Sequence, residues 1–242
     1  MKFTLHIWRQ AHATAQGQFE RFQIDVSEDT SLLEMLDALN EQLIQQGKEA
    51  IAFDYDCREG ICGACSLVIN GTPHGKYFAT TSCQQYMRDY RDEKELWIEP
   101  WRATAFPVIK DLIVDRQALD MIIQAGGYID IHTGSAPEAN TIPVEKQCAD
   151  FAFDAAACIG CGACVAVCPN ASATLFVAAK VAHLTALPQG QIDKRRAKKM
   201  LAEMERQGFG TCSNYRECER VCPKEIKVNT ITKLNQWVYR RD

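Results

Sequence analysis

The first hundred residues alternate between apolar and polar side chains in a pattern that predicts a sheet crossed by one helix. Residues 3–8 and residues 19–24 carry an apolar side chain at about every second position, the period of a half-buried strand. Ser31 and Glu34 then form the capping box of a helix. The apolar positions of that helix recur at helical spacing: Leu32, Leu33, Leu36, Leu39 and Leu43. We therefore expect two strands followed by an amphipathic helix.

Two further strands are expected to complete this sheet. Residues 66–70 favour a strand, and Asn70-Gly71 supplies a hairpin turn. Residues 96–99 are expected to close the sheet. A short sheet with one helix laid across it is a β-grasp-like arrangement, so residues 1–100 are predicted to form a first domain. Residues 101–117 contain Pro107 and little pattern, and we interpret them as a linker.

Beyond the linker, strand signals fade and helical periodicity replaces them. Residues 118–123 fit a helix that Gly126-Gly127 ends. Residues 133–147 are polar, contain two prolines, and are expected to form a surface loop. Three more helices are expected over residues 171–184, 193–207 and 229–240. The fold class is therefore predicted to be α+β, with a mostly helical second domain over residues 101–242.

The overall composition is that of a folded protein. The chain has 242 residues, 47% of them hydrophobic and 24% charged, which suits one large domain or two ordinary ones. No apolar run approaches the roughly 18–20 residues that span a bilayer. The opening residues become polar too early for a secretory signal, so we expect the chain to stay where it is made. In a reducing cytoplasm its twelve cysteines are better explained as thiolate ligands than as disulfides.

The net charge of −4 is unevenly distributed along the chain. Residues 1–110 carry 11 basic and 16 acidic side chains, which gives −5, whereas residues 193–242 carry 13 basic and 7 acidic side chains, which gives +6. A positive C-terminal region suits an acidic partner or an anionic membrane surface. The basic run at residues 194–199 fits a solvated helix face at least as well. Nucleic acid is disfavoured because no aromatic-rich basic stripe accompanies the charge.

Four cysteines of the first domain have the spacing of a plant-type ferredoxin. They follow the pattern C-x4-C-x2-C…C, which binds a 2Fe–2S cluster: Cys57, Cys62, Cys65 and Cys83. Such a loop needs backbone N–H groups that point at the sulfurs, and Gly60 and Gly63 permit that close approach. The alternatives are a zinc ribbon or buried cysteines without a ligand. Zinc usually takes paired C-x2-C units, which this set lacks.

The two C-terminal cysteine runs share one spacing, and the second run lacks a cysteine. The first reads C-x2-C-x2-C-x3-C-P, and the second repeats it with tyrosine at the second position. The first run consists of Cys158, Cys161, Cys164 and Cys168, and the second of Cys212, Tyr215, Cys218 and Cys222. In two-cluster ferredoxins, the fourth cysteine of each run binds the other run's cluster. We therefore expect the two runs to exchange their last cysteines.

This exchange predicts two unequal clusters. Cys158, Cys161, Cys164 and Cys222 would bind a 4Fe–4S cluster. Cys168, Cys212 and Cys218 would bind the other, with Tyr215 at its remaining corner. A phenol is a harder and bulkier donor than a thiolate, so we expect one iron to be absent and the cluster to be 3Fe–4S. The alternative is that Tyr215, a water molecule or another side chain completes a 4Fe–4S cluster.

The remaining candidate groups indicate no substrate chemistry. Cys148 stands outside the three patterns, and a lone cysteine is by default a small buried apolar residue. The five histidines do not cluster. The chain has no glycine-rich phosphate loop, nucleophile elbow or paired-carboxylate signature. We therefore assign no catalytic residue.

Three segments give the chain a family resemblance. Residues 57–65 (CREGICGAC), residues 106–112 (FPVIKDL) and the two C-terminal cysteine runs resemble the iron–sulfur subunit of succinate dehydrogenase and fumarate reductase, the family of respiratory complex II. The resemblance extends nearly from end to end and keeps the same order. It implies a β-grasp ferredoxin domain followed by a helical ferredoxin domain. It also implies that the eleven cysteines assigned above are the cluster ligands.

The resemblance implies partners as well. In the family, a flavoprotein subunit interconverts succinate and fumarate at covalent FAD, and a membrane cytochrome b subunit binds haem b and forms a quinone site. Electrons would pass from the flavin through 2Fe–2S, 4Fe–4S and 3Fe–4S to the quinone. The resemblance thus implies a peripheral subunit on the cytoplasmic face of a bacterial inner membrane. The rival interpretations are an iron–sulfur subunit of another flavoprotein:quinone oxidoreductase and a zinc-stabilised adaptor.

The chain departs from the family pattern at two places. Ubiquinone-type members follow the first C-P with tryptophans and place histidine after the first cysteine of the second run. This chain has residues 170–174 (NASAT) and Ser213 there, which favours a different quinone pocket, menaquinone and a haem-bearing cytochrome b. The 17 residues between Cys65 and Cys83 also exceed the spacing in many relatives and suggest an enlarged hairpin loop.

Overall fold

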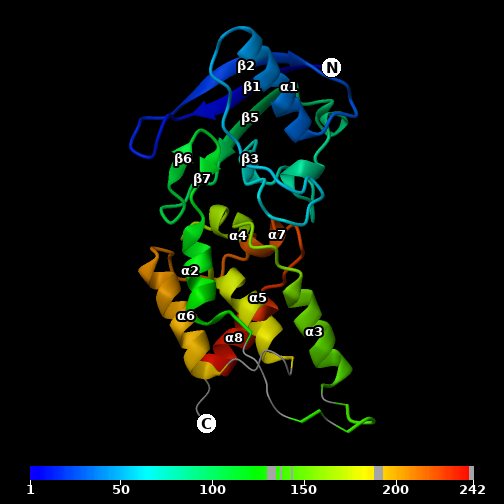
Figure 1. Ribbon diagram of the computed structural model, residues 1–242, viewed down its shortest axis with the longest axis vertical. Helices are drawn as coiled ribbons and strands as arrows, with labels where there is room; N and C mark the ends of the chain where they lie inside the picture. The colour runs from blue at the N-terminus through cyan, green and yellow to red at the C-terminus, as the bar shows by residue number, and fades with distance from the viewer. Residues whose placement is uncertain (130–134, 137, 143, 188–192, 240–242) are drawn as a thin grey trace.

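The computed structural model describes the chain except for residues 130–134, 137, 143, 188–192 and 240–242. It consists of a sheet-containing half and a helical half, stacked along the long axis of the molecule (Figure 1). Each half has its own hydrophobic core. The predicted α+β fold is confirmed, whereas the domain boundary at residue 100 stays a prediction.

The first half is built on a five-stranded sheet with the order β2-β1-β5-β3-β4. Its strands are β1 (Lys2–Arg9), β2 (Gln18–Asp25), β3 (Leu67–Ile69), β4 (Thr72–Pro73) and β5 (Glu95–Pro100). The predicted strands are confirmed, and the last of them in the sequence, β5, lies in the middle of the sheet. β5 pairs parallel with β1 and antiparallel with β3. This inner position leaves Leu96 and Ile98 fully buried.

Helix α1 (Leu32–Gln45) packs on the sheet, as predicted. Ser31 is its N-cap, and the reciprocal bonds between Ser31 and Glu34 complete the capping box. The predicted leucine positions are all buried. The Asn70-Gly71 turn is also confirmed, because both residues have positive φ angles, 49° and 77°, between β3 and β4. Such angles are those of the hairpin turns that asparagine and glycine favour.

The segment interpreted as a linker has more structure than its sequence pattern indicated. It contains the hairpin β6 (Val108–Lys110) and β7 (Ile113–Val114), and its Trp101 and Phe106 side chains are buried. The Asp111 carboxylate, also buried, accepts hydrogen bonds from the backbone N–H groups of Gln10 (2.9 Å) and Ala52 (3.0 Å). The hairpin is therefore anchored to the sheet-containing half.

Among its described residues, the helical half contains the four predicted helices and three that were missed. Its elements are α2 (Gln117–Gly126), α3 (Lys146–Ala156), α4 (Ala163–Ala166), α5 (Thr174–Thr185), α6 (Lys194–Arg206), α7 (Glu217–Arg220) and α8 (Asn229–Tyr239). The missed helices are α3, which begins inside the expected loop at 133–147, and the single-turn helices α4 and α7. Part of that loop, and the expected helix end at residue 240, lie outside the described residues. Among the described residues, no helix has the length and apolar character that a membrane crossing requires.

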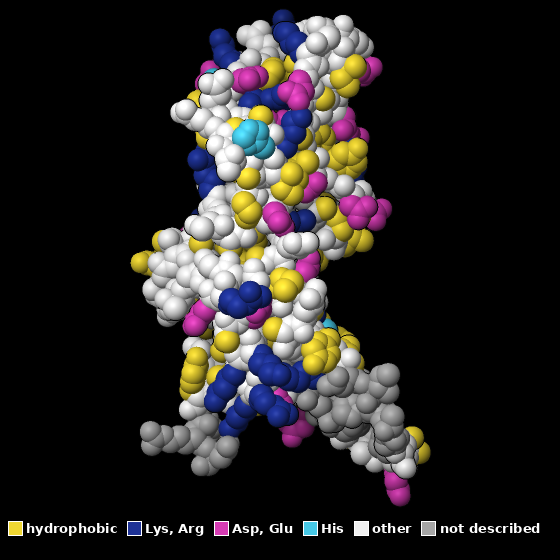
Figure 2. Space-filling model, turned by 60° about the vertical axis from the view of Figure 1, so that its left-hand side comes forward, with side chains coloured by type: hydrophobic (Ala, Val, Ile, Leu, Met, Phe, Trp, Pro, Cys, Tyr) yellow, Lys and Arg dark blue, Asp and Glu magenta, His cyan; other side chains and the backbone are white. Residues whose placement is uncertain are grey.

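The uneven charge of the sequence is visible on the surface. Lys and Arg side chains gather over the lower, helical half of the face shown in Figure 2. Helix α6 contributes exposed Arg195, Lys198 and Lys199. The partner of this basic surface stays a prediction.

Candidate iron–sulfur sites

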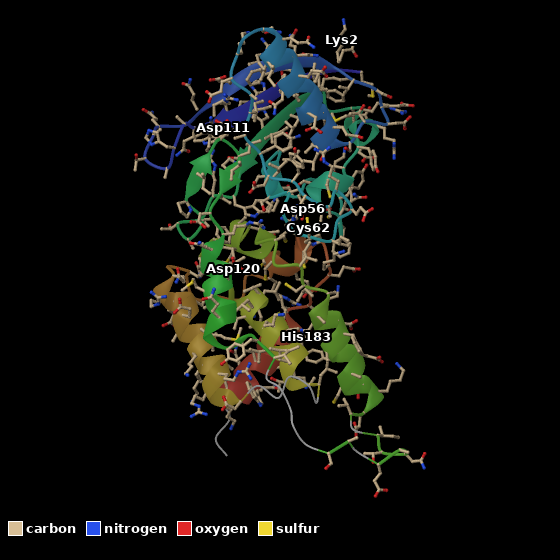
Figure 3. The ribbon with its side chains drawn as sticks, in the orientation of Figure 1. Lys2, Asp56, Cys62, Asp111, Asp120 and His183 are labelled. Carbon is tan, nitrogen blue, oxygen red and sulfur yellow. The ribbon has the colours of Figure 1, made fainter. Side chains whose placement is uncertain are left out.

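The four cysteines predicted to bind 2Fe–2S come from one loop and one short 3₁₀ helix. Cys57, Cys62 and Cys65 lie between α1 and β3, and Cys83 lies in η1 (Ser82–Gln84), after the β3–β4 hairpin. The Cys65 thiol is hydrogen-bonded to the Cys83 sulfur, which lowers the pKa of Cys83 to about 5 and raises the pKa of Cys65. Cys62 is exposed and faces the helical half from the lower edge of the sheet-containing half (Figure 3).

Backbone N–H groups point at these sulfurs, as expected for an anionic cluster site. The N–H of Glu59 donates to Cys57 Sγ (3.3 Å) and the N–H of Ala64 donates to Cys62 Sγ (3.4 Å). The bonds from Glu59 and Ile61 lower the pKa of Cys57 to about 7. Hydrogen bonds of this kind stabilise negative charge on sulfur. Four sulfurs with inward N–H donors therefore fit a 2Fe–2S cluster.

Two residues of this site were not predicted. Thr81 Oγ1 lies 3.2 Å from Cys83 Sγ, and Gln84 Nε2 donates to the same sulfur at 3.7 Å. Gly60 has a φ of 73°, and a Cβ there would lie 3.1 Å from Thr81 Oγ1. Thr81 and Gln84 could have been identified from the sequence, because both lie within two residues of Cys83.

A second group of cysteines surrounds a small cavity in the helical half. Its four sulfur-bearing residues are Cys158, Cys161, Cys164 and Cys222. Burial raises the pKa of each of these thiols. At Cys222 a hydrogen bond from the Ile226 backbone N–H to Sγ (3.4 Å) lowers the thiol pKa and so opposes the effect of burial. Three members come from the first run and one from the second, which is the exchange that the spacing predicts.

The third group surrounds a small neighbouring cavity. It contains Cys168 from the first run and Cys212 and Cys218 from the second, with Tyr215 in the lining. The Asn214 backbone N–H donates to Cys212 Sγ at 3.4 Å. Tyr215 is 55% exposed. The three sulfurs and one phenol thus share one cavity, and this donor set fits a cluster that lacks one iron.

The sulfurs surround cavities and do not converge on a point. In the part of the chain that the structure describes, no three His, Cys, Asp or Glu side chains are placed to hold a single metal ion. Cys148, expected to be buried, is instead exposed. It lies in the first turn of α3, whose buried residues, Ala152 and Ala155, come later in the helix.

The polypeptide segments of the first two sites are in direct contact. The Trp101 indole Nε1 donates to the carbonyl oxygen of Cys161 at 2.9 Å, so the segment after β5 is bonded to a cysteine of the helical half. Arg116 Nη1 donates to the carbonyl oxygen of Gly63 at 2.6 Å. Sequence patterns singled out neither residue for this role.

Comparisons with known proteins find iron–sulfur domains in both halves of the chain. The 2Fe-2S iron-sulfur cluster binding domain family matches residues 4–121, and the 4Fe-4S dicluster domain family matches residues 154–226. The chain is 28% identical over 241 residues to the succinate dehydrogenase iron-sulfur subunit of Bacillus subtilis, covering 95% of this chain and 90% of that protein. It is 26% identical to the fumarate reductase iron-sulfur subunit of Escherichia coli O6:H1, covering 85% and 79% respectively.

A solved structure shows the same fold. A chain of the Mycobacterium smegmatis Sdh1 complex in the apo form superposes with a TM-score of 0.69 at 21% sequence identity, covering 98% of this chain and 95% of that one. The chain therefore carries a 2Fe-2S domain followed by a 4Fe-4S dicluster domain, and over nearly its whole length it is similar to the iron–sulfur subunits of succinate dehydrogenase and fumarate reductase.

Proposed function

We propose that this chain carries electrons between a flavoprotein succinate/fumarate site and a membrane quinone site through three clusters. The observation that carries the proposal is the grouping of the cysteines of the two C-terminal runs around two cavities, which supports an exchange of their last cysteines. Each cavity combines cysteines of both runs, as in two-cluster ferredoxins. Such one-electron centres can oxidise a two-electron-reduced flavin one electron at a time. The chain itself contributes no catalytic residue.

The proposed ligand sets follow the three groups of sulfurs. Cys57, Cys62, Cys65 and Cys83 hold 2Fe–2S; Cys158, Cys161, Cys164 and Cys222 hold 4Fe–4S; Cys168, Cys212 and Cys218 hold 3Fe–4S. Backbone N–H groups orient the sulfurs and stabilise their charge. Burial of the second set withholds its sulfurs from solvent. The clusters, once bound, supply reversible one-electron oxidation and reduction.

The proposed partners are those of complex II. A flavoprotein subunit with FAD lies at the 2Fe–2S end, and a membrane anchor with haem b and a menaquinone site lies at the 3Fe–4S end. The chain then sits on the cytoplasmic face of the bacterial inner membrane through the anchor. The relatives named succinate dehydrogenase and fumarate reductase subunits support this assembly. The sequence Asn170–Thr174 and Ser213 in place of tryptophans and histidine supports a quinone other than ubiquinone.

Metal analysis tests the cluster assignment directly. We expect about nine iron atoms per chain, or about ten if the last corner is filled, together with acid-labile sulfide. The oxidised protein should show the electron paramagnetic resonance (EPR) signal of 3Fe–4S. A colourless protein with zinc and no iron would establish the adaptor interpretation instead. Co-purification with a flavoprotein that oxidises succinate would distinguish complex II from other flavoprotein:quinone oxidoreductases.

The Tyr215→Cys variant tests the ligand exchange. A thiolate at this position would supply the missing donor, so we expect the 3Fe–4S signal of the oxidised protein to disappear and the iron content to rise by about one atom. Tyr215→Ser is the matched control, because it removes the phenol without adding a thiolate, and it should keep the signal. An oxidised signal that persists unchanged in Tyr215→Cys would show that the proposed exchange is wrong.

A further inference from the structure

The 2Fe–2S loop and the 4Fe–4S loop touch through their backbones. Gly63, between Cys62 and Cys65, has a φ of 75°. A Cβ at Gly63 would lie 2.6 Å from the carbonyl oxygen of Ile159 and 3.2 Å from Cα of Cys161. Only glycine allows the two backbones to lie this close together. The loop of the 2Fe–2S site is therefore in direct contact with the loop of the 4Fe–4S site.

One cation bridges this contact. Arg116 Nη1 donates to the carbonyl oxygen of Gly63 at 2.6 Å and to the carbonyl oxygen of Cys161 at 3.3 Å. Arg116 is half-buried and is the residue from which α2 starts. Its backbone is therefore fixed by a helix of the second half, while its guanidinium is bonded to a loop of each half.

The charge of Arg116 acts on groups of the sheet-containing half. Burial lowers the pKa of His74, and the charge of Arg116 lowers it further. It also opposes the rise in pKa that burial causes at Asp54. Arg116 is thus a positive charge at the junction of two sites that each become more negative when they accept an electron.

We propose that Arg116 is a positioning residue of the relay: bonded to Gly63 and Cys161, it clamps the two loops together and raises the reduction potentials of both the 2Fe–2S and the 4Fe–4S clusters. The physical reason is that a fixed cation stabilises the reduced, more negative form of a nearby cluster. Hydrogen bonds and nearby charge are among the protein's means of setting cluster potentials. The proposal rests on the proposed function, because it requires these clusters to be the ones bound.

The test is a redox titration of the assembled complex, with each cluster followed by its EPR signal. In Arg116→Gln, we expect the ratio of reduced to oxidised cluster at a fixed potential to fall about tenfold for 2Fe–2S and for 4Fe–4S. For a one-electron couple that is a shift of about 59 mV to lower potential. The 3Fe–4S cluster is the internal reference, since its cysteines accept no bond from Arg116, and its potential should stay in place.

Two further variants separate charge from general effects. Arg21→Gln removes one exposed positive charge from β2 of the sheet-containing half and should leave all three potentials unchanged. Arg116→Lys keeps the charge and should shift the 2Fe–2S and 4Fe–4S potentials by less than half as much as Arg116→Gln. If Arg116→Gln does not assemble, Arg116→Lys alone decides: a full tenfold loss despite the retained charge overturns the electrostatic account.

The outcomes distinguish this inference from the proposed function. Unchanged potentials in an Arg116→Gln complex that holds all its clusters would overturn the role of Arg116 and leave the relay intact. A shift of only one of the two clusters would overturn the shared bridge. An equal shift of all three clusters would indicate a global change and would also overturn it. Absence of 2Fe–2S or 4Fe–4S from the unaltered complex would overturn the proposed function itself.

Discussion

The Gly63→Ala substitution would test how tightly the two cluster loops are packed. Gly63 has a φ of 75°, so any L side chain there is strained, at a cost of about 1–2 kcal/mol. The new methyl group would also lie 2.6 Å from the carbonyl oxygen of Ile159, and overpacking of this kind costs about 1–3 kcal/mol. The neighbouring atoms are backbone and cannot rotate away. We therefore expect destabilisation of about 2–5 kcal/mol.

The matched control is Gly47→Ala, after the end of α1. Gly47 has a similar φ of 67°, but its Cβ would meet nothing within 4 Å, so the control carries the backbone strain without the clash. Each kcal/mol lowers the melting temperature of a chain of this size by about 2–4 °C. We expect the melting temperature of Gly63→Ala to fall about twice as far as that of Gly47→Ala.

The assay is thermal denaturation of the assembled protein, followed by circular dichroism and by the visible absorbance of the clusters. Gly63→Ala should lose its absorbance at a lower temperature than Gly47→Ala, because the loop that carries Cys62 is displaced from the loop that carries Cys161. Equal melting temperatures in the two variants, with clusters retained in both, would refute the backbone contact.

Two further predictions concern the sheet-containing half. Burial lowers the pKa of His74 to about 3. Between pH 6.5 and pH 3, His74 therefore binds a proton in the unfolded chain but not in the folded chain. The free energy of unfolding falls as the pH decreases through this window, and His74 has no such effect above it. His74→Gln should remove about 2 kcal/mol of the stability lost between pH 7 and pH 5, and melting curves that change in parallel with pH in both proteins would contradict this. Ser31→Ala should cost about 1 kcal/mol by removing the N-cap of α1, measured as a fall in melting temperature, whereas Ser27→Ala, before the helix, should change it little.

Helices and strands were predicted from the sequence where the segment itself has a clear repeat of apolar residues. The helix after Ser31 has both a capping box and leucines on one face, so α1 was predicted almost to its ends. The partner of each strand was harder to predict. β5 pairs with β1 from about ninety positions away in the sequence, and parallel pairing requires a crossover that periodicity does not reveal. The sequence therefore predicted this strand but not its central place in the sheet.

Polar contacts that join distant segments escaped the sequence patterns. The buried Asp111 carboxylate accepts hydrogen bonds from the backbone N–H groups of Gln10 and Ala52. The sequence around Asp111 does not indicate these donors. Helix α3 was missed because its buried face consists of two alanines, which give little hydrophobic contrast. Arg116 was missed for the same reason as Asp111, since its role depends on where Gly63 and Cys161 meet.

Local backbone geometry divides the sulfurs of the first cysteine run between two cavities. Gly160 and Gly162 have φ angles of 64° and 87°, so the chain curls between the first three cysteines and turns their sulfurs toward one cavity. Helix α4 then carries the chain onward, and Cys168, four residues after Cys164, reaches the neighbouring cavity. Leu175 lines both cavities, and the charge of Cys218 acts on Cys164 across the boundary. The two sites are therefore adjacent because a single turn of helix joins them, and a change in that turn would alter the separation of two redox centres without removing a ligand.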